Sequence, residues 1–361
     1  MIPVGTRPII EHIVRSLHLA GIRDIIVVVG YRREQVIRFL NDLDPSIRVI
    51  TQDRQLGTAH ALQCAEPFLT ENFLLLPGDN YIDAGSVRAL SACQNAMLVK
   101  EHPNPSNFGV VSIHGGYVTG IVEKPELAPS FTVSTGIFSL TRDVFRYKGI
   151  NDIPDVIGCM IRDGVRVKAL EASDWQDALY PWDFIRMNSR FLSYITPEKN
   201  GTIHKTAIIR GPVSIGEGAR IGPYSEITGP VMIGRDSVIG TSCIILPDTS
   251  IGARCSAEPF SYIGKSLIMD DVSIGSHSRV TDAVLGNGCQ LSDHTVIRPG
   301  RNVIEIEGCP VKAEFGAVIG DQTVAGPFCA IAGSIIGNGV VIGEENHRIR
   351  GMVIPDNTMV M

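Results

Sequence analysis

The apolar residues of this 361-residue chain follow two different patterns, which divide it near residue 197. In the first part, short β-branched or leucine-rich runs alternate with amphipathic segments. Apolar runs of this length are typical of buried strands, and apolar residues at helical spacing are typical of helices. Residues 1–197 are therefore predicted to form an α/β domain built from alternating strands and helices.

Particular elements follow from the same pattern. Helices are expected at residues 8–19, 31–40, 59–65 and 85–93 and from Trp182 onward. Strands are expected at residues 25–29, 48–51, 96–100, 109–113, 117–123, 132–140 and 166–170. Leu74, Leu75 and Leu76 form an apolar run of the kind that a buried parallel strand needs.

After residue 200 the apolar positions follow a six-residue period. Isoleucine stands at every sixth position from 203 to 263, except for alanine at 257. Four residues after each lies a second column of mostly small residues, such as Val213, Ser225 and Cys243. One large and one small inward residue in each hexapeptide predict a parallel β-helix of triangular section over residues 198–361.

The β-helix is expected to have interruptions. The register of the large column slips by one residue near 268 and again at 285, which predicts loops or bulges there. Val303 and Cys309 continue the spacing from Ile297, so coil is expected to run on through that segment. Coils are then expected to persist from Ile319 to the end of the chain.

Composition and charge narrow the classes of function. The chain is 44% hydrophobic and 19% charged, which is ordinary for a soluble globular protein. Its 32 basic and 38 acidic residues give a net charge of −6, which argues against a nucleic-acid partner but not against a small phosphorylated ligand. The eight cysteines lack any CxxC spacing, which favours reduced thiols. Without a signal peptide or spanning segment, the protein is predicted to be cytoplasmic and to bind no membrane.

The stretch from residue 52 to 80 carries the clearest chemical signal. Gly57 and Thr58 open a predicted helix, and a glycine there lets the backbone approach a planar ligand. Asp79 follows the apolar run, where a strand would end. Ligands of open α/β sheets bind beyond the carboxyl ends of strands, so this stretch is predicted to form the floor of a nucleotide site.

Several motifs in the first domain resemble those of the sugar-1-phosphate nucleotidyltransferases. They are QDRQLGT, PGD, NFGVV, IVEKP, STG and YPWDF. The whole layout is similar to members of that family with a C-terminal left-handed β-helix, including the bifunctional UDP-N-acetylglucosamine pyrophosphorylase/acetyltransferases and archaeal sugar nucleotidyltransferases. The resemblance implies a Rossmann-like nucleotidyltransferase domain followed by a left-handed parallel β-helix of hexapeptide repeats.

The beginning of the chain departs from the family pattern. The family's first strand and its GxGTRxxP loop with the following lysine are missing, so the first domain is expected to be N-terminally incomplete. VGTRPIIEHIV aligns just downstream of that loop. Gly5, Thr6 and Arg7 are expected to be a plain lead-in to a helix, because one glycine without a preceding strand cannot form a nest of N–H groups.

The resemblance implies roles for individual residues. Recognition of uracil or thymine is assigned to Gln52, Gln55, Gly57 and Thr58. Contacts with the sugar and its phosphate are assigned to Gly109, Glu123, Lys124, Thr135 and Gly136. Binding of Mg²⁺ is assigned to Asp79 and Asp183, and Asp79 and Lys124 are the expected catalytic residues. The family usually has asparagine where this chain has Ser134.

The chemistry of such a transfer needs these residue types. Attack of a sugar phosphate on a nucleoside triphosphate brings two polyanions together, so carboxylates that hold Mg²⁺ and a lysine that holds phosphate are required. Each candidate also has a structural interpretation. Asp79 could be a turn aspartate, Asp183 a helix N-cap, and Glu123 with Lys124 a charged strand end.

The expected function is nucleotidyl transfer from UTP or dTTP to a sugar 1-phosphate, giving an NDP-sugar and pyrophosphate. One alternative is a catalytically silent or regulatory paralogue, because the glycine loop is missing. Another is a β-helix acetyltransferase acting on an amino-sugar 1-phosphate, for which His294 and Lys312 are candidates. A homo-oligomer, such as a trimer, is expected to form through the β-helix.

Overall fold

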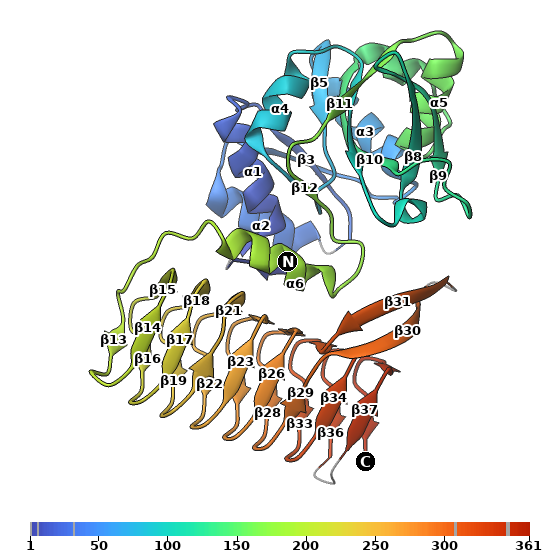
Figure 1. Cartoon of the computed structure of the whole chain (residues 1–361). Helices are drawn as coiled ribbons and strands as arrows, with labels where there is room; N and C mark the ends of the chain where they lie inside the picture. Colours follow the sequence, from blue (N-terminus) through green and yellow to red (C-terminus); the bar gives the residue numbers. More distant parts are fainter. Residues whose placement is uncertain (1, 6, 32, 307–308, 344–346) are drawn as a thin grey trace. The chain divides into compact units, whose positions relative to one another are not determined.

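The computed structural model describes residues 2–5, 7–31, 33–306, 309–343 and 347–361 (Figure 1). The chain packs into two compact units. The first comprises Ile9–Asp177, and the second comprises Ile2–Pro8 together with Ala178–Met361. None of the helices in the described ranges is long and apolar enough to cross a membrane.

The helices of the first unit begin and end close to the expected positions. They are α1 (Ile9–Leu19), α2 (Arg33–Leu43), α3 (Thr58–Ala65), α4 (Ala84–Ser91) and α5 (Ile153–Arg162), with short 3₁₀ turns at Glu66–Phe68, Pro105–Asn107 and Arg142–Arg146. In α4, Asp83 is the N-cap and its carboxylate accepts the Ser86 N–H at 2.9 Å. Helix α5 was not predicted, although Pro154 stands in its first turn, a preferred position for proline.

The strands of the first unit form one mixed sheet and two small pairs. The six-stranded sheet has the order β5 (Asn72–Leu75), β10 (Thr132–Thr141), β7 (Ala96–Glu101), β11 (Val167–Glu171), β9 (Tyr117–Glu123) and β8 (Gly109–His114). The pairs are β3 (Ile26–Val29) with β4 (Arg48–Thr51), and β6 (Tyr81–Ile82) with β12 (Trp175–Gln176). Helix α5 packs into the core of this unit through Ile157 and Met160, which are fully buried together with Phe138 of β10.

The apolar run at Leu74, Leu75 and Leu76 is not the buried parallel strand that the pattern predicted. β5 pairs antiparallel with β10 at the edge of the sheet, and its leucines are only half-buried. The prediction was wrong because no strand within the described ranges pairs with the other edge of β5. The strand still leads directly into the loop that carries Asp79.

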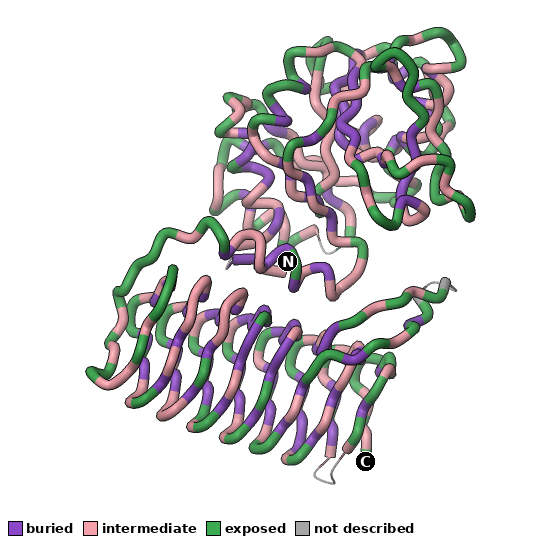
Figure 2. The backbone as a smooth tube through the Cα atoms, in the orientation of Figure 1, coloured by how far each residue is buried: buried purple, intermediate pink, exposed green. Residues whose placement is uncertain are grey.

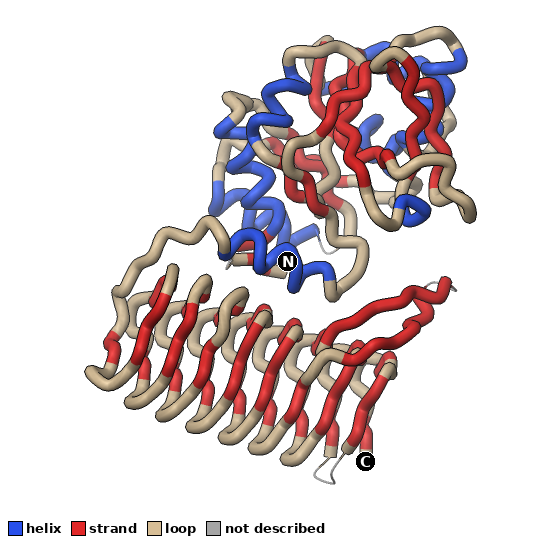
Figure 3. The backbone as a smooth tube through the Cα atoms, viewed as in Figure 1, coloured by secondary structure: helices blue, strands red, loops and turns tan. Residues whose placement is uncertain are grey.

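The second unit is mainly a parallel β-helix of three sheets (Figure 3). The first sheet contains β13 (Thr202–Ile203), β16 (Arg220–Ile221), β19 (Val238–Ile239), β22 (Ser256–Ala257), β25 (Ser273–Ile274), β28 (Gln290–Leu291), β33 (Val324–Ala325), β36 (Val341–Ile342) and β39 (Met359–Val360). The second contains β14 (Ile208–Arg210), β17 (Glu226–Thr228), β20 (Ile244–Ile245), β23 (Tyr262–Gly264), β26 (Arg279–Thr281), β29 (Val296–Ile297), β34 (Ala330–Ala332) and β37 (Arg348–Arg350). The third contains β15 (Val213–Ile215), β18 (Val231–Ile233), β21 (Thr249–Ile251), β24 (Leu267–Ile268), β27 (Ala283–Leu285), β32 (Ala317–Ile319), β35 (Ser334–Ile336) and β38 (Val353–Ile354).

The two predicted columns of residues line the interior of the coils. Ile215, Ile233 and Ile251 pair in register on successive coils and are buried, as are Cys243 and Cys255 in the small column. Figure 2 shows buried and exposed positions alternating along each coil. The predicted parallel β-helix is therefore confirmed, and these two cysteines are packing residues.

The register slips near 268 and 285 do not interrupt the coil. Ile251 pairs with Ile268, and Ile268 pairs with Leu285, so each coil here is one residue shorter while its inward column stays aligned. The real interruption is the antiparallel hairpin of β30 (Gly300–Ile306) and β31 (Cys309–Phe315). The expectation of coil through Val303 is wrong, because Val303 pairs with Lys312 across the hairpin and is exposed.

The division by packing differs from the boundary expected at residue 197. Helix α6 (Asp183–Leu192) belongs to the second unit and packs on β21, β24 and β27. Its fully buried Asn188 accepts the Gly5 N–H at 2.9 Å and the Ser250 hydroxyl at 2.8 Å. Gly5 lies between β1 (Pro3–Val4) and β2 (Arg7–Pro8), so this first turn is anchored to α6 and the β-helix.

Candidate active site

The loop between β4 and α3 holds the residues assigned to base recognition. Gln52 extends the pairing of β4, because its N–H donates to the Val29 carbonyl at 2.8 Å. Its side-chain Nε2 donates to the Gly57 carbonyl at 3.1 Å and lies 2.8 Å from His60 Nδ1. Gln55 packs over Gly30, where a Cβ would come within 2.9 Å of Gln55 Nε2. Gln52 thus closes the loop, and Gln55 covers the carboxyl end of β3.

Gly57 and Thr58 are fixed by the segment that leads into α5. Gly57 has a φ of +119°, and a Cβ there would overlap the Asn151 carbonyl. The Thr58 hydroxyl accepts the Ile153 N–H at 2.9 Å, and the Thr58 N–H lies 3.3 Å from Asp152 Oδ1. The close approach that requires a glycine at position 57 is therefore made by the protein's own backbone.

The Asp79 loop is tied to the middle of β10. The buried Asn80 side chain donates to the Thr135 carbonyl at 3.0 Å, and the Thr135 hydroxyl donates to the Leu98 carbonyl at 2.9 Å. Gly136 has a φ of +74°, in a stretch where the register of β10 with β7 shifts, and a Cβ there would lie 2.9 Å from Pro77 Cγ. The structure therefore brings together three of the predicted site residues, Asp79, Thr135 and Gly136.

The carboxylate of Asp79 lies in an exposed loop that is nevertheless crowded by the rest of the unit. Loss of hydration there raises the pKa of the Asp79 carboxyl above its usual range. Within the described residues, no cation or side-chain donor contacts the carboxylate. Among these residues the carboxylate accepts only from its own backbone N–H and is therefore accessible to an external cation.

A second group of predicted residues gathers at the end of β9. Gly109 pairs with Glu123, and a Cβ at Gly109 would lie 2.9 Å from Glu123 Oε2 and 3.8 Å from the Ser134 Cβ. Lys124 follows with a φ of +43°, and its N–H donates to the Phe108 carbonyl at 3.0 Å. Left-handed backbone at a lysine is uncommon and costs free energy, so the surrounding contacts hold it there.

Asp152 lies near both the base-recognition loop and the residues at the end of β9. It was not among the residues predicted to form the site. Its carboxylate contacts Thr58 and also acts on Glu123 through space. Desolvation raises the pKa of Glu123; Lys124 opposes this shift, and the negative charge of Asp152 adds to it. The signal for Asp152 was the Asp-Ile-Pro sequence at the start of α5, which is typical of a helix N-terminus.

Asp183, the second predicted metal ligand, lies in the other compact unit. It is buried in the first turn of α6, where its Oδ2 accepts the Tyr180 N–H at 2.9 Å and its Oδ1 lies 3.2 Å from Arg186 Nη2. Asp183 is therefore the first residue of α6 and not its N-cap, which is Trp182. Over the described ranges, no three His, Cys, Asp or Glu side chains gather as a metal-binding group.

Comparison with known proteins identifies the class of protein. Residues 1–191 match the nucleotidyl transferase family model, which covers more than half of the chain. Residues 227–360 match the GMPPB C-terminal domain. The chain therefore belongs to the nucleotidyltransferase family, and the resemblance to sugar-1-phosphate nucleotidyltransferases is confirmed.

Particular relatives share most of their length with this chain. The bifunctional protein GlmU of Methanococcus maripaludis is 32% identical over 96% of this chain and 88% of that protein. The low-salt glycan biosynthesis nucleotidyltransferase Agl11 of Haloferax volcanii is 28% identical over 86% of this chain and 93% of that protein. A glucose-1-phosphate thymidylyltransferase of Streptomyces antibioticus is 27% identical over 81% of this chain and 87% of that protein.

Proposed function

We propose that the protein transfers a nucleotidyl group from UTP or dTTP to a sugar 1-phosphate, forming an NDP-sugar and releasing pyrophosphate. One observation carries this proposal: Asp152 hydrogen-bonds to Thr58, and helix α5, which Asp152 directly precedes, packs on β9, the strand that ends at Glu123. Groups assigned to the nucleotide and to the sugar phosphate thus lie close together in one compact unit. Family membership and the names of the relatives support the same reaction.

The loop after β4 would bind the base of the nucleotide. The Gln55 amide can donate to and accept from the edge of a pyrimidine, and Gln52, whose Nε2 contacts Gly57 and His60, can accept through Oε1. Their positions are set by Gly57 and Gly30, so the loop is shaped before the ligand arrives. Such preorganisation lowers the free-energy cost of binding.

Lys124 and Glu123 would position the sugar phosphate. The Lys124 ammonium supplies a positive charge for the phosphate, and Glu123 offers its carboxylate to sugar hydroxyls. The phosphate is already an anion and can attack without a general base, so positioning and charge neutralisation provide the catalysis.

Asp79 fits a role in binding Mg²⁺. Magnesium prefers oxygen ligands and usually keeps one or two protein carboxylates together with phosphate oxygens and water. The Asp79 carboxylate is exposed and contacts no cation within the described residues, so it satisfies this requirement. Mg²⁺, when bound, neutralises charge on the triphosphate. Asp183 is proposed as the second ligand on the resemblance alone.

The alternatives gain no specific support. A silent or regulatory paralogue would share these contacts, so only turnover distinguishes it. For an acetyltransferase, His294 is stacked between His277 and Phe328, at centroid distances of 5.1 and 4.8 Å, and Lys312 lies on β31 of the hairpin. Homo-oligomerisation through the β-helix stays a prediction, for which sedimentation of the full chain is the test.

The experiment that tests the proposal is identification of the product. Purified protein is incubated with Mg²⁺, one sugar 1-phosphate and either UTP or dTTP, and the mixture is analysed by mass spectrometry. We expect the mass of an NDP-sugar with at least one pair among glucose 1-phosphate and N-acetylglucosamine 1-phosphate. Binding of the substrates without any product would favour the silent paralogue. Release of thiol from acetyl-CoA with glucosamine 1-phosphate would favour the acetyltransferase.

A further inference from the structure

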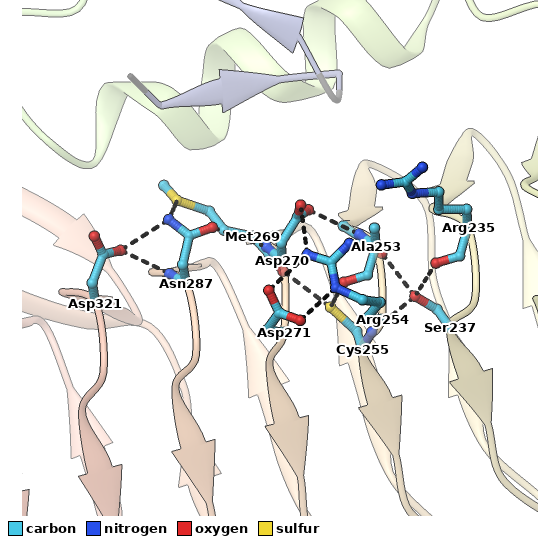
Figure 4. Close-up of polar contacts among 11 residues, drawn as sticks. Arg235, Ser237, Ala253, Arg254, Cys255, Met269, Asp270, Asp271, Asn287 and Asp321 are labelled. Atoms are coloured by element: carbon cyan, nitrogen blue, oxygen red, sulfur yellow. Dashed lines mark hydrogen bonds and ion pairs between the residues drawn. The ribbon is translucent and has the colours of Figure 1, made fainter. Parts of the chain in front are cut away.

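One corner of the β-helix is held by a ladder of side-chain oxygens that we call the Asx ladder. At each step an Asp or Asn Oδ1 accepts the backbone N–H of the corner residue one coil earlier, at distances from 2.8 to 3.3 Å. The ladder runs through Ala253, Asp270, Asn287, Asp321, Asn338 and Asp356. Figure 4 shows the part of the ladder from Ala253 to Asp321.

The side chains of the ladder stop at Asp270. On the two preceding coils the corner residues are Ala253 and Arg235, since Ile233 pairs with Ile251 in the adjoining strands. Alanine has no side-chain oxygen that could accept the Arg235 N–H, so the hydrogen bond of this step, the next rung of the ladder, is missing. Arg235 and Asp270 point to the same side of the corner, with the short Ala253 side chain between them (Figure 4).

A hollow of about 430 Å³ lies at this missing rung. Its walls include Arg235, Asp270, the outward-facing Met232 of β18 and Pro3 of β1, all of which belong to the second unit. The volume falls within the range of pockets that hold small organic ligands, roughly 300–1,000 Å³. The short side chain of Ala253 leaves the space between Arg235 and Asp270 open.

The two arginines near the hollow differ in their ion pairing. Arg254 is paired with Asp271 at 2.6 and 2.7 Å and lies 3.4 Å from Asp270 Oδ2. Arg235, by contrast, forms no ion pair with any described residue. A guanidinium can bind a phosphate through two parallel hydrogen bonds, so Arg235 is a group in the lining of the hollow that is suited to binding an anion.

We propose that this hollow binds a small organic phosphate. The Arg235 guanidinium would hold the phosphate, Met232 and Pro3 would pack against the rest of the molecule, and Asp270 would accept from a hydroxyl group. The site lies wholly in the second unit and is distinct from the residues proposed for nucleotidyl transfer. The proposal does not depend on that activity.

The test is calorimetric titration of the full chain with glucose 1-phosphate, using free glucose as the comparison. The titration is made in a Lys124→Ala background, because the proposed substrate site could also bind the probe. We expect glucose 1-phosphate to bind and free glucose to give no measurable heat. Arg235→Gln should weaken binding by about tenfold or more, since it removes a charge-assisted contact. Arg220→Gln, an exposed arginine on another sheet, should leave the affinity within about twofold.

A second variant separates ligand binding from damage to the fold. Ala253→Asn should restore the missing hydrogen bond of the ladder, because its Oδ1 can accept the Arg235 N–H and its side chain occupies the space between Arg235 and Asp270. We expect it to abolish binding while raising the unfolding temperature by about 2–4 °C. Binding that persists in both Arg235→Gln and Ala253→Asn, or no binding to the parent chain, would overturn the proposal.

Discussion

The carboxyl groups of Asp79 and Glu123 lie in surroundings that disfavour their charge. Desolvation raises the pKa of each carboxyl. A raised pKa in the folded state means that ionisation costs folding free energy. The cost is fully present above the folded pKa and absent below the pKa of the unfolded chain, about 3.9 for Asp and 4.3 for Glu.

Removing the Asp79 charge should therefore stabilise the metal-free protein at neutral pH. With EDTA present, Asp79→Asn is expected to have a higher unfolding temperature than the parent at pH 7.5. The difference should shrink as the pH falls toward 4, because the parent carboxyl then becomes neutral as well. Scanning calorimetry at several pH values measures this. A difference that is independent of pH would show that the carboxylate is not desolvated.

Lys124 combines an uncommon backbone conformation with the proposed phosphate contact. Lys124→Ala and Lys124→Gly are both expected to lower kcat/KM for the sugar phosphate by about 10²–10³-fold, because both remove the ammonium. Lys124→Gly should be the more stable of the two by about 1 kcal/mol, since glycine adopts a φ of +43° without steric cost.

The control for these variants is the exposed Lys148. Steady-state kinetics and denaturant unfolding of Lys148→Ala should match the parent protein. If Lys124→Gly kept full activity, the backbone of residue 124 rather than its charge would be the functional feature.

At the scale of elements, residues 151–153 lock the base-recognition loop onto the start of α5. Asp152→Ala removes an acceptor for the Thr58 N–H and hydroxyl. We expect a loss of about 1 kcal/mol in the free energy of unfolding and a several-fold rise in KM for the nucleotide. The same substitution at Asp163, whose carboxylate accepts from the Tyr147 hydroxyl, should leave that KM unchanged. An equal rise in both variants would contradict the role of this contact.

The isoleucine column provides the packing energy of the β-helix. Ile233→Ala removes a buried side chain between two coils and should cost about 2–5 kcal/mol in the free energy of unfolding. Ile244→Ala, on an outward position, should cost well under about 1 kcal/mol. Chemical denaturation of both variants is the measurement, and equal costs would show that the column is not the core.

Repetition explains why these elements could be predicted. The six-residue period fixes which residues point inward, so the coil could be derived from sequence. Val303 kept the spacing while leaving the coil, because a period cannot distinguish an inward position from one in a hairpin. β5 could not be placed as an edge strand, because its neighbours are set by pairing between distant segments. Asp152 lies far from Thr58 in sequence, and nothing local indicated that contact.

At the scale of the whole molecule, the chain divides between Asp177 and Ala178. Asn188 explains why α6 belongs to the second unit, since this buried side chain joins Gly5 to Ser250. The composition changes only after residue 200, and for that reason the sequence predicted a later boundary. The proposed nucleotide and sugar-phosphate contacts all lie in the first unit, whereas Asp183 lies in the second.

The most direct test of the account is the rate of pyrophosphate release with UTP or dTTP, a sugar 1-phosphate and Mg²⁺. The parent protein and Asp42→Asn, an exposed aspartate of α2, should release pyrophosphate at equal rates. Asp79→Asn should lower the rate by about 10³-fold or more while remaining folded. Equal rates in Asp79→Asn and the parent, or no release by the parent with any pair of substrates, would contradict the account.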